Sequence, residues 1–118
     1  MVVVVDYDEA VREATKSLMR SVGYNASTFG SADEFLESEQ VHDTSCLITD
    51  LNMPGLSGID LQDHLVAGGY CIPTIFITGY PDDSVRARAM NAGAVGFLSK
   101  PFTDDHLIAC IERALKAN

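Results

Sequence analysis

Hydrophobic positions along the chain alternate between short continuous runs and a helical spacing of three and four residues. This pattern predicts five strands separated and followed by five helices. The predicted strands are residues 2–5, 25–29, 46–49, 74–78 and 94–99. The predicted helices are residues 9–22 and 58–67, together with helices running from Ser31 through Leu36, from Asp82 to Gly93 and from Thr103 through Leu115.

The first helix has a clear apolar side and a capping residue. Val11, Ala14, Leu18 and Val22 recur at helical spacing, so we expect them to form the buried face. Asp8 stands just before the helix and is a predicted N-cap, because its carboxylate can accept a free N–H of the first turn.

Other helix starts also carry capping residues. Ser31 and Glu34 have the spacing of a capping box, in which the serine accepts the Glu34 amide and Glu34 accepts the Ser31 amide. Asp82 is the expected N-cap of the fourth helix, and Thr103 opens the last one.

The regular exchange of strands and helices predicts an α/β fold in a single domain. Strands joined through helices run parallel, and the sheet is then covered on both faces, which makes it doubly wound. The central predicted strands are apolar without alternation, as strands buried on both faces should be. In such a sheet, ligands bind outside the carboxyl ends of the strands.

Polar side chains stand where the predicted strands end. Asp6 and Asp8 follow the first strand, Asp50 the third, Thr78 ends the fourth, and Lys100 follows the fifth. Since the carboxyl ends of parallel strands share one rim, we expect these side chains to lie close together. Crowded carboxylates repel each other and favour a hard cation such as Mg²⁺, and a carboxylate can also attack phosphorus to form an aspartyl phosphate.

Composition narrows the classes of partner. The 118 residues include 17 Asp and Glu against 8 Lys and Arg, which gives a net charge of −9. That charge argues against direct binding to nucleic acid or an anionic membrane, and it favours cations and basic protein surfaces. No apolar run approaches the ~20 residues that span a bilayer, and residues 1–5 lack the basic flank of a signal peptide.

The cysteines and histidines indicate no metal or disulfide framework. Cys46, Cys71 and Cys110 form no CxxC pair and have apolar neighbours, so we expect buried or half-buried thiols in a reducing compartment. The three histidines are scattered singly along the chain.

Four segments resemble the receiver domains of two-component response regulators. They are residues 5–6, 47–55, 77–79 and 93–102, and the likeness extends over nearly all of the chain. Residues 50–62 and 93–102 are most similar to the nitrogen-fixation type of regulator. The resemblance implies a flavodoxin-like fold for a receiver domain of residues 1–118, with any output domain, such as a transcription factor, beyond residue 118.

The resemblance also implies roles for site residues. Asp50 would accept a phosphoryl group from a sensor histidine kinase, and Lys100 would pair with the phosphoryl oxygens. Thr78 would be the switch hydroxyl and Phe97 the switch aromatic. Mg²⁺ would be held by Asp6, Asp50 and the backbone carbonyl of Asn52. The peptide bond from Lys100 to Pro101 would be cis, as is usual in this family.

Partners follow from the same resemblance. The chain would be a cytoplasmic signalling domain rather than an enzyme, and a surface spanning residues 82–115 would contact a second copy or an effector. The surface of the first helix, including Arg12 and Lys16, would face the kinase.

Tyr7 departs from the family pattern. Receiver domains usually carry two adjacent acids after the first strand, and the second of them binds Mg²⁺; here Asp6 fills the first place and Tyr7 the second. A phenol is a poor Mg²⁺ ligand at neutral pH, so we expect weakened metal binding unless Asp8 or Glu9 replaces it.

Three alternatives remain open from the sequence. A receiver that lost phosphorylation would act as an interaction module, and Tyr7 motivates that interpretation. The spacing of Asp6 and Asp8 after the first strand also matches the first motif of haloacid dehalogenase-type phosphatases. In such an enzyme Asp6 would be the nucleophile and Asp8 the general acid, and Thr78 and Lys100 would belong to the later motifs. A flavin-binding flavodoxin is disfavoured, because its first loop should offer hydroxyls and amides rather than acids.

Overall fold

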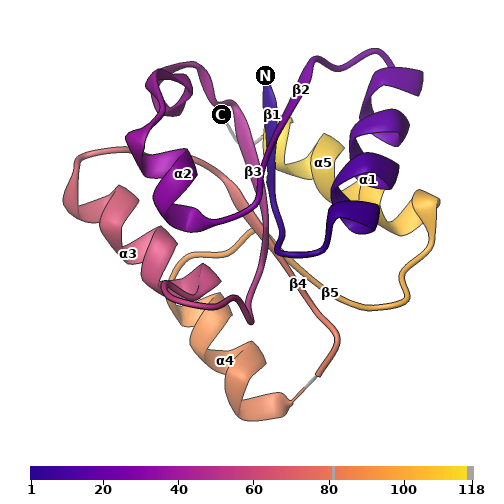
Figure 1. The fold of residues 1–118 in the computed structure, drawn as a ribbon. Helices are drawn as coiled ribbons and strands as arrows, with labels where there is room; N and C mark the ends of the chain where they lie inside the picture. Colours follow the sequence, from indigo (N-terminus) through magenta and orange to yellow (C-terminus); the bar gives the residue numbers. More distant parts are fainter. Residues whose placement is uncertain (81, 117–118) are drawn as a thin grey trace.

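The computed structural model describes residues 1–80 and 82–116, and its elements follow the predicted order (Figure 1). The strands are β1 (Val2–Val5), β2 (Ala26–Phe29), β3 (Cys46–Asp50), β4 (Thr74–Thr78) and β5 (Gly96–Ser99). The helices are α1 (Glu9–Ser21), α2 (Ala32–Glu37), the 3₁₀ helix η1 (Glu39–Asp43), α3 (Gly58–Ala67), α4 (Asp83–Asn91) and α5 (Asp104–Lys116). Pro81, Ala117 and Asn118 of the predicted 1–118 domain lie outside the described residues.

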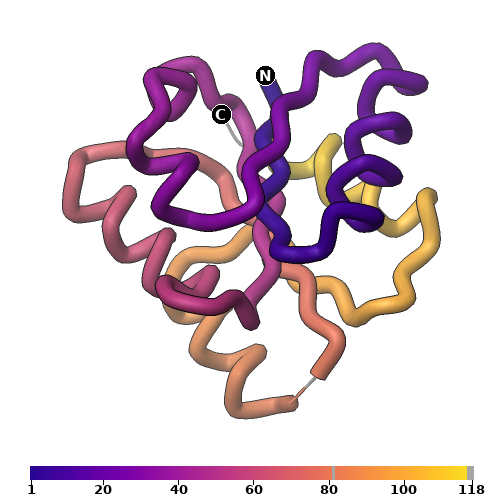
Figure 2. Tube along the Cα trace, viewed as in Figure 1, coloured from indigo at the N-terminus to yellow at the C-terminus, as the bar shows by residue number. Residues whose placement is uncertain are grey.

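The strands form one parallel sheet in the order β2-β1-β3-β4-β5, which confirms the predicted doubly wound fold. α1 and α5 cover one face, and α2, α3 and α4 cover the other (Figure 1). Figure 2 shows α1 and α5, from opposite ends of the chain, on the same side of the sheet. Strand order reverses between β1 and β3, so their carboxyl ends border the crevice where ligands bind in such sheets.

Most boundaries differ from the prediction by one or two residues, and the start of β5 has a backbone reason. β5 begins at Gly96 rather than at residue 94. The Ala94 N–H donates to the Ala89 carbonyl at 3.2 Å, so Ala94 still takes part in the turn that follows α4, and the Val95 N–H donates to the Thr74 carbonyl at 2.9 Å. β3 gains Asp50 as its last residue.

The buried face of α1 was predicted only in part. Thr15 and Met19 are the buried residues of this helix, whereas Ala14 and Val22 are exposed. Val11 and Leu18 are half-buried at the edge of the core. The apolar pattern missed Thr15 because its hydroxyl counts as polar, although its methyl group suits a buried position.

Most predicted caps are present. The Asp8, Ser31, Asp82 and Thr103 side chains each accept a backbone N–H of the first turn that follows. The predicted capping box at Ser31 is incomplete, because Glu34 Oε2 accepts the amide of the preceding Gly30 at 2.9 Å.

A complete capping box instead starts α3. The Ser57 hydroxyl accepts the Asp60 N–H and the Asp60 carboxylate accepts the Ser57 N–H, both at 3.1 Å. Directly after this cap, Gly58 packs so tightly that a Cβ atom would lie 2.5 Å from the backbone oxygen of Asp50. The start of α3 therefore lies directly against the strand end that carries Asp50.

Candidate functional site

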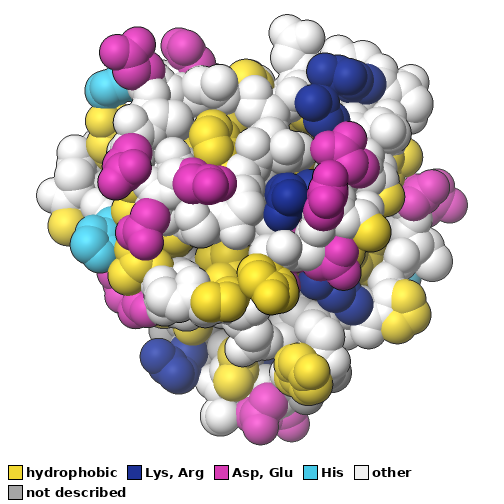
Figure 3. Space-filling view, viewed as in Figure 1, with side chains coloured by type: hydrophobic (Ala, Val, Ile, Leu, Met, Phe, Trp, Pro, Cys, Tyr) yellow, Lys and Arg dark blue, Asp and Glu magenta, His cyan; other side chains and the backbone are white. Residues whose placement is uncertain are grey.

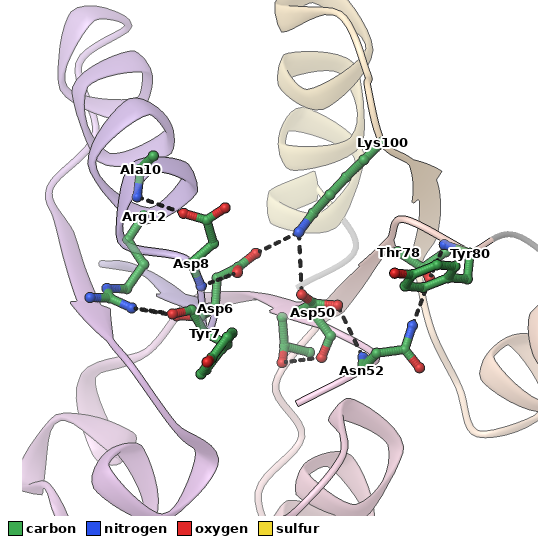
Figure 4. Close-up of polar contacts among 11 residues, drawn as sticks. Asp6, Tyr7, Asp8, Ala10, Arg12, Asp50, Asn52, Thr78, Tyr80 and Lys100 are labelled. Atoms are coloured by element: carbon green, nitrogen blue, oxygen red, sulfur yellow. Dashed lines mark hydrogen bonds and ion pairs between the residues drawn. The ribbon is translucent and has the colours of Figure 1, made fainter. Parts of the chain in front are cut away.

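Three charged side chains meet at the carboxyl ends of the strands. Lys100 Nζ lies 3.2 Å from Asp6 Oδ2 and 3.2 Å from Asp50 Oδ2. Asp6 follows β1 and Asp50 ends the neighbouring β3, while Lys100 follows β5 and extends across the rim toward both (Figure 4). The lysine thus lies between two carboxylates that come from different strands.

Asp6 is fully buried, and its surroundings change its acidity. Loss of hydration raises the pKa of Asp6; the Asp8 N–H, 2.8 Å from Oδ1, and the Lys100 charge act in the opposite direction. Burial alone would lower the pKa of Lys100, but the negative charges of Asp6 and Asp50 outweigh it and raise that pKa. Lys100 is therefore a firmly protonated cation at neutral pH.

Asp50 is the more accessible of the two acids, with 8% of its surface exposed against 0% for Asp6. Its Oδ1 accepts the Asn52 N–H at 3.0 Å, and its Oδ2 contacts Lys100. These contacts orient a carboxylate that still reaches the molecular surface.

The hydroxyl of Thr78 belongs to the same rim but does not contact the Asp50 carboxylate. Thr78 is fully buried, and its Oγ1 accepts the Asn52 Nδ2–H at 2.9 Å and the Tyr80 N–H at 3.0 Å. The Thr78 carbonyl also accepts the Lys100 N–H at 2.7 Å, which ties the ends of β4 and β5 together.

Phe97 lies on β5, away from these polar groups. Its ring is half-buried and packs against a small cluster formed by Leu51, Phe76, Ala89 and Ala94. The ring also borders the α4–β5 surface, so it occupies an intermediate position between core and solvent.

Tyr7 stands where receiver domains usually carry a second acid, so the rim has one acid fewer than the family pattern. Its side chain is 66% exposed and points away from Lys100 (Figure 4). The Asp8 carboxylate is used as the N-cap of α1, where Oδ1 accepts the Ala10 N–H at 2.9 Å. Asp6 and Asp50 are therefore the two acids in contact with Lys100.

The oxygen donors at the rim suit a magnesium ion. Mg²⁺ is usually held by one or two carboxylates together with water and phosphate oxygens, and Asp6, Asp50 and the Asn52 carbonyl are donors of that kind. Within residues 1–80 and 82–116, no group of three His, Cys, Asp or Glu side chains is placed to hold a metal. The donor set thus fits an open magnesium site that keeps water or phosphate ligands better than a closed protein cage.

Arg12 fixes the loop that carries the acids, a role that sequence reasoning missed. Its Nη1 donates to the Asp6 carbonyl at 2.7 Å and to the Tyr7 carbonyl at 3.2 Å. An arginine in the first turn after an acidic loop is the only signal that could have indicated this contact.

The cysteines agree with the prediction in part. Cys46, Cys71 and Cys110 are all free thiols, but Cys71 is exposed rather than buried, because it lies in the loop before β4. Burial, and to a smaller extent the neighbouring Cys110, raises the pKa of the Cys46 thiol to about 12, so this thiol is unreactive.

With this geometry established, comparison with known proteins identifies the family. A sequence profile described as the response regulator receiver domain matches residues 2–112. This chain belongs to the response regulator receiver domain family.

Relatives of this receiver domain support the nitrogen-fixation type. Nodulation protein W of Bradyrhizobium diazoefficiens is 46% identical over 114 residues, which cover 97% of this chain and 50% of that protein. Transcriptional regulatory protein FixJ of the same organism is 38% identical over 113 residues, covering 96% of this chain and 55% of that protein. The chain thus spans about half the length of these curated relatives.

A solved structure agrees with the fold. The response regulator StyR, known from a low-resolution structure, is 45% identical and superposes with a TM-score of 0.91, covering 99% of this chain and 59% of that one. Family membership makes this chain a signalling domain of the two-component type rather than a classical enzyme, so the phosphatase alternative is not supported. No helix within the described part of the receiver domain has the length and apolar character to cross a bilayer.

A first prediction concerns the cost of burying Asp6 in this receiver domain. Its folded-state pKa lies above the ordinary 3.8, so the ionised carboxylate opposes folding above that folded-state pKa, and the penalty disappears as pH falls toward 3.8. We expect Asp6→Asn to raise the melting temperature at pH 7 by roughly 2–5 °C, with a smaller gain near pH 4. Scanning calorimetry at several pH values measures both effects.

The matched control is Asp63→Asn, which changes an exposed acid on α3 and should leave the melting temperature unchanged. A lower melting temperature for Asp6→Asn at pH 7 would show that the Asp6–Lys100 ion pair outweighs the loss of hydration.

A second prediction concerns Tyr7. Its exposed side chain can be replaced without disturbing the core, and a carboxylate there would add a third acid to the rim. We expect Tyr7→Asp to tighten Mg²⁺ binding roughly tenfold, since ligand charge sets the affinity of such sites. Isothermal titration with Mg²⁺ tests this, with Tyr7→Asn as the uncharged control; equal affinities for Tyr7→Asp and wild type would contradict it.

Proposed function

We propose that this receiver domain accepts a phosphoryl group on Asp50 from a sensor histidine kinase and thereby switches an output. The observation that carries the proposal is the Lys100 ammonium, held 3.2 Å from both Asp6 and Asp50 at the strand rim. Receiver domains as a family bind Mg²⁺ at the phosphorylation site and interact with histidine kinases and output domains.

The transfer chemistry needs placement and charge neutralisation more than covalent help. An oxygen of the Asp50 carboxylate attacks phosphorus, forming an O–P bond as the N–P bond of the kinase phosphohistidine breaks. Lys100 stabilises the charge on the phosphoryl oxygens, and the Asn52 N–H keeps the carboxylate oriented. Mg²⁺, held by Asp6, Asp50 and the Asn52 carbonyl when bound, would supply further positive charge.

The switch follows from the position of Thr78. A phosphoryl group on Asp50 adds strong acceptor oxygens close to β4 and draws the Thr78 hydroxyl toward them. Phe97 then turns from its half-buried position into the space that Thr78 leaves. This shift is a bias between two arrangements of one fold.

The kinase is proposed to dock on α1. A groove of about 460 Å³ lies beside α1, near Lys100. Three half-buried or exposed apolar residues of α1 line it together with Pro101 and Phe102, namely Val11, Ala14 and Leu18. Basic side chains over α1 are interspersed with acidic ones in the view of Figure 3. Lys16 is the basic residue we assign to the kinase contact, since the Arg12 guanidinium is already bound to loop carbonyls.

The output is proposed to be transcriptional. FixJ is a transcriptional regulator about twice as long as this match, so a DNA-binding output domain beyond residue 118 of the full protein is the expected target. We place the protein in the cytoplasm, where such a kinase and such an output would meet. The surface of residues 82–115, which includes Met90 and Phe97, is the proposed site of homodimer or effector contact.

Labelling with acetyl phosphate tests the phosphoacceptor. We expect wild type and Asp6→Asn to be labelled in the presence of Mg²⁺, the variant more slowly, and Asp50→Asn to remain unlabelled. Label retained by Asp50→Asn and lost from Asp6→Asn would instead support the phosphatase-like assignment.

A second function has one observation in its favour. Because Tyr7 points away from the rim, metal support is reduced, which suits a receiver that acts as an interaction module without phosphorylation. No label on wild type at any Mg²⁺ concentration would favour this function.

A third prediction concerns the switch. Thr78→Ala removes the hydroxyl that responds to phosphorylation but leaves Asp50 and Lys100 intact. We expect this variant to be labelled and yet to show no phosphorylation-dependent change in dimerisation by sedimentation, whereas Thr78→Ser should retain the change. A full dimer shift in Thr78→Ala would remove Thr78 from the mechanism.

A further inference from the structure

We infer that the side chain of Asn52 acts as a latch: its hydrogen bond holds the Thr78 hydroxyl in the position that it occupies while Asp50 is unphosphorylated. This inference rests on the proposed function, in which Thr78 moves toward a phosphoryl group on Asp50. It assigns to the Asn52 amide group a role separate from that of the backbone carbonyl expected to bind metal.

The latch is visible in the hydrogen bonds of one residue. Asn52 donates its backbone N–H to Asp50 Oδ1 at 3.0 Å and its side-chain Nδ2–H to Thr78 Oγ1 at 2.9 Å (Figure 4). A single residue therefore touches both the predicted phosphoacceptor and the predicted switch hydroxyl.

The second donor to Thr78 has a different character. The Tyr80 N–H, 3.0 Å from Thr78 Oγ1, belongs to the same β4 loop, two residues further on, and can move together with Thr78. Asn52 follows β3, so its bond joins two separate strand ends. Moving Thr78 toward a phosphoryl oxygen on Asp50 therefore changes the Asn52 bond first.

Both acceptor positions of the Thr78 hydroxyl are occupied, and this sets the cost of switching. A hydroxyl oxygen has two lone pairs, and here they are used by Asn52 and Tyr80. Motion toward the phosphoryl group breaks the neutral Asn52 bond, in which the Thr78 oxygen accepts, while the Thr78 O–H donates to a phosphoryl oxygen in a stronger charge-assisted bond. The Asn52 bond thus opposes spontaneous switching but is too weak to oppose it once Asp50 carries a phosphoryl group.

The experiment compares Asn52→Ala with wild type. Asn52 is exposed, so the substitution creates no cavity, and its backbone carbonyl remains. The probe is beryllofluoride, which occupies the place of a phosphoryl group on a carboxylate. We expect Asn52→Ala to bind beryllofluoride about threefold to tenfold more tightly at saturating Mg²⁺, the worth of one neutral hydrogen bond.

The matched control is the Thr78→Val background, in which there is no hydroxyl to hold. There, Asn52→Ala should leave beryllofluoride affinity unchanged, and the same gain in both backgrounds would overturn the latch. The Thr78 methyl resonance, followed by NMR without any phosphoryl group, should shift in Asn52→Ala toward its beryllofluoride-bound position.

These readouts separate two failures. If wild type binds no beryllofluoride, the proposed phosphorylation fails, but the Thr78 methyl resonance of Asn52→Ala, compared with that of unliganded wild type, still tests the latch. An unchanged Thr78 resonance in Asn52→Ala would contradict the latch even if Asp50 is phosphorylated normally.

Discussion

Replacing Lys100 by methionine is expected to lower the rate of phosphoryl transfer from acetyl phosphate to Asp50 by about a hundredfold or more, as removal of a charge-stabilising donor does elsewhere. The ammonium lies 3.2 Å from the oxygen of Asp50, where charge develops on the incoming phosphoryl group. Methionine keeps the length and apolar stem of lysine but carries no charge. Labelling rates at saturating Mg²⁺ measure the loss.

The same substitution should also change the acids that Lys100 contacts. Asp6 and Asp50 would face each other without a cation, which raises the pKa of the fully buried Asp6 further and lowers stability at neutral pH. Lys116→Met, at an exposed position on α5, is the matched control and should be labelled like wild type. Normal labelling of Lys100→Met would remove Lys100 from the transfer step.

Gly58→Ala is expected to destabilise the domain by about 1–3 kcal/mol and to displace Asp50. A Cβ at this position would lie 2.5 Å from the Asp50 oxygen and 3.2 Å from the Leu51 Cα, and both are backbone atoms of the strand end. Backbone held in a sheet cannot move aside as the tip of a flexible side chain can. Urea unfolding gives the stability, and acetyl phosphate labelling reports the position of Asp50.

Gly79→Ala provides the control for Gly58→Ala. Its added Cβ would meet nothing within 4 Å, so stability should stay within about 0.5 kcal/mol of wild type. If Gly58→Ala had the same midpoint urea concentration of unfolding as wild type, α3 could move away from Asp50 without loss of stability, which would contradict this prediction.

The sequence was sufficient for the fold and for the grouping of the site. Continuous apolar strands separated by helices allow a parallel sheet, and in such a sheet residues that follow different strands reach the same rim. For this reason Asp6, Asp50 and Lys100 could be placed together although they lie far apart in the chain. The cis bond between Lys100 and Pro101, expected from the family resemblance, is also present.

Features that depend on side-chain direction could not be predicted in the same way. The rotation of α1 depends on how Thr15 and Met19 fit the sheet, and apolar spacing alone favoured Ala14 and Val22. The hydrogen bond from the Asn52 side-chain amide to Thr78 joins the ends of two strands, and the distance between these side chains cannot be predicted from the spacing of residues in the sequence.

Gly58 shows a further limit of sequence reasoning. A glycine at a helix start is usually interpreted locally, as a tolerated residue near a cap. Its close approach to Asp50 is a tertiary contact that appears only when α3 is packed against β3.

The central claim is that Asp50 carries the phosphoryl group. Locating the phosphoryl group directly is its sharpest test: wild-type protein is treated with acetyl phosphate and Mg²⁺, trapped by borohydride reduction, digested and sequenced by mass spectrometry. The account predicts a single reduced residue at Asp50, and no reduction when Mg²⁺ is removed by a chelator. Modification at Asp6, or none under conditions that saturate the metal site, would contradict it.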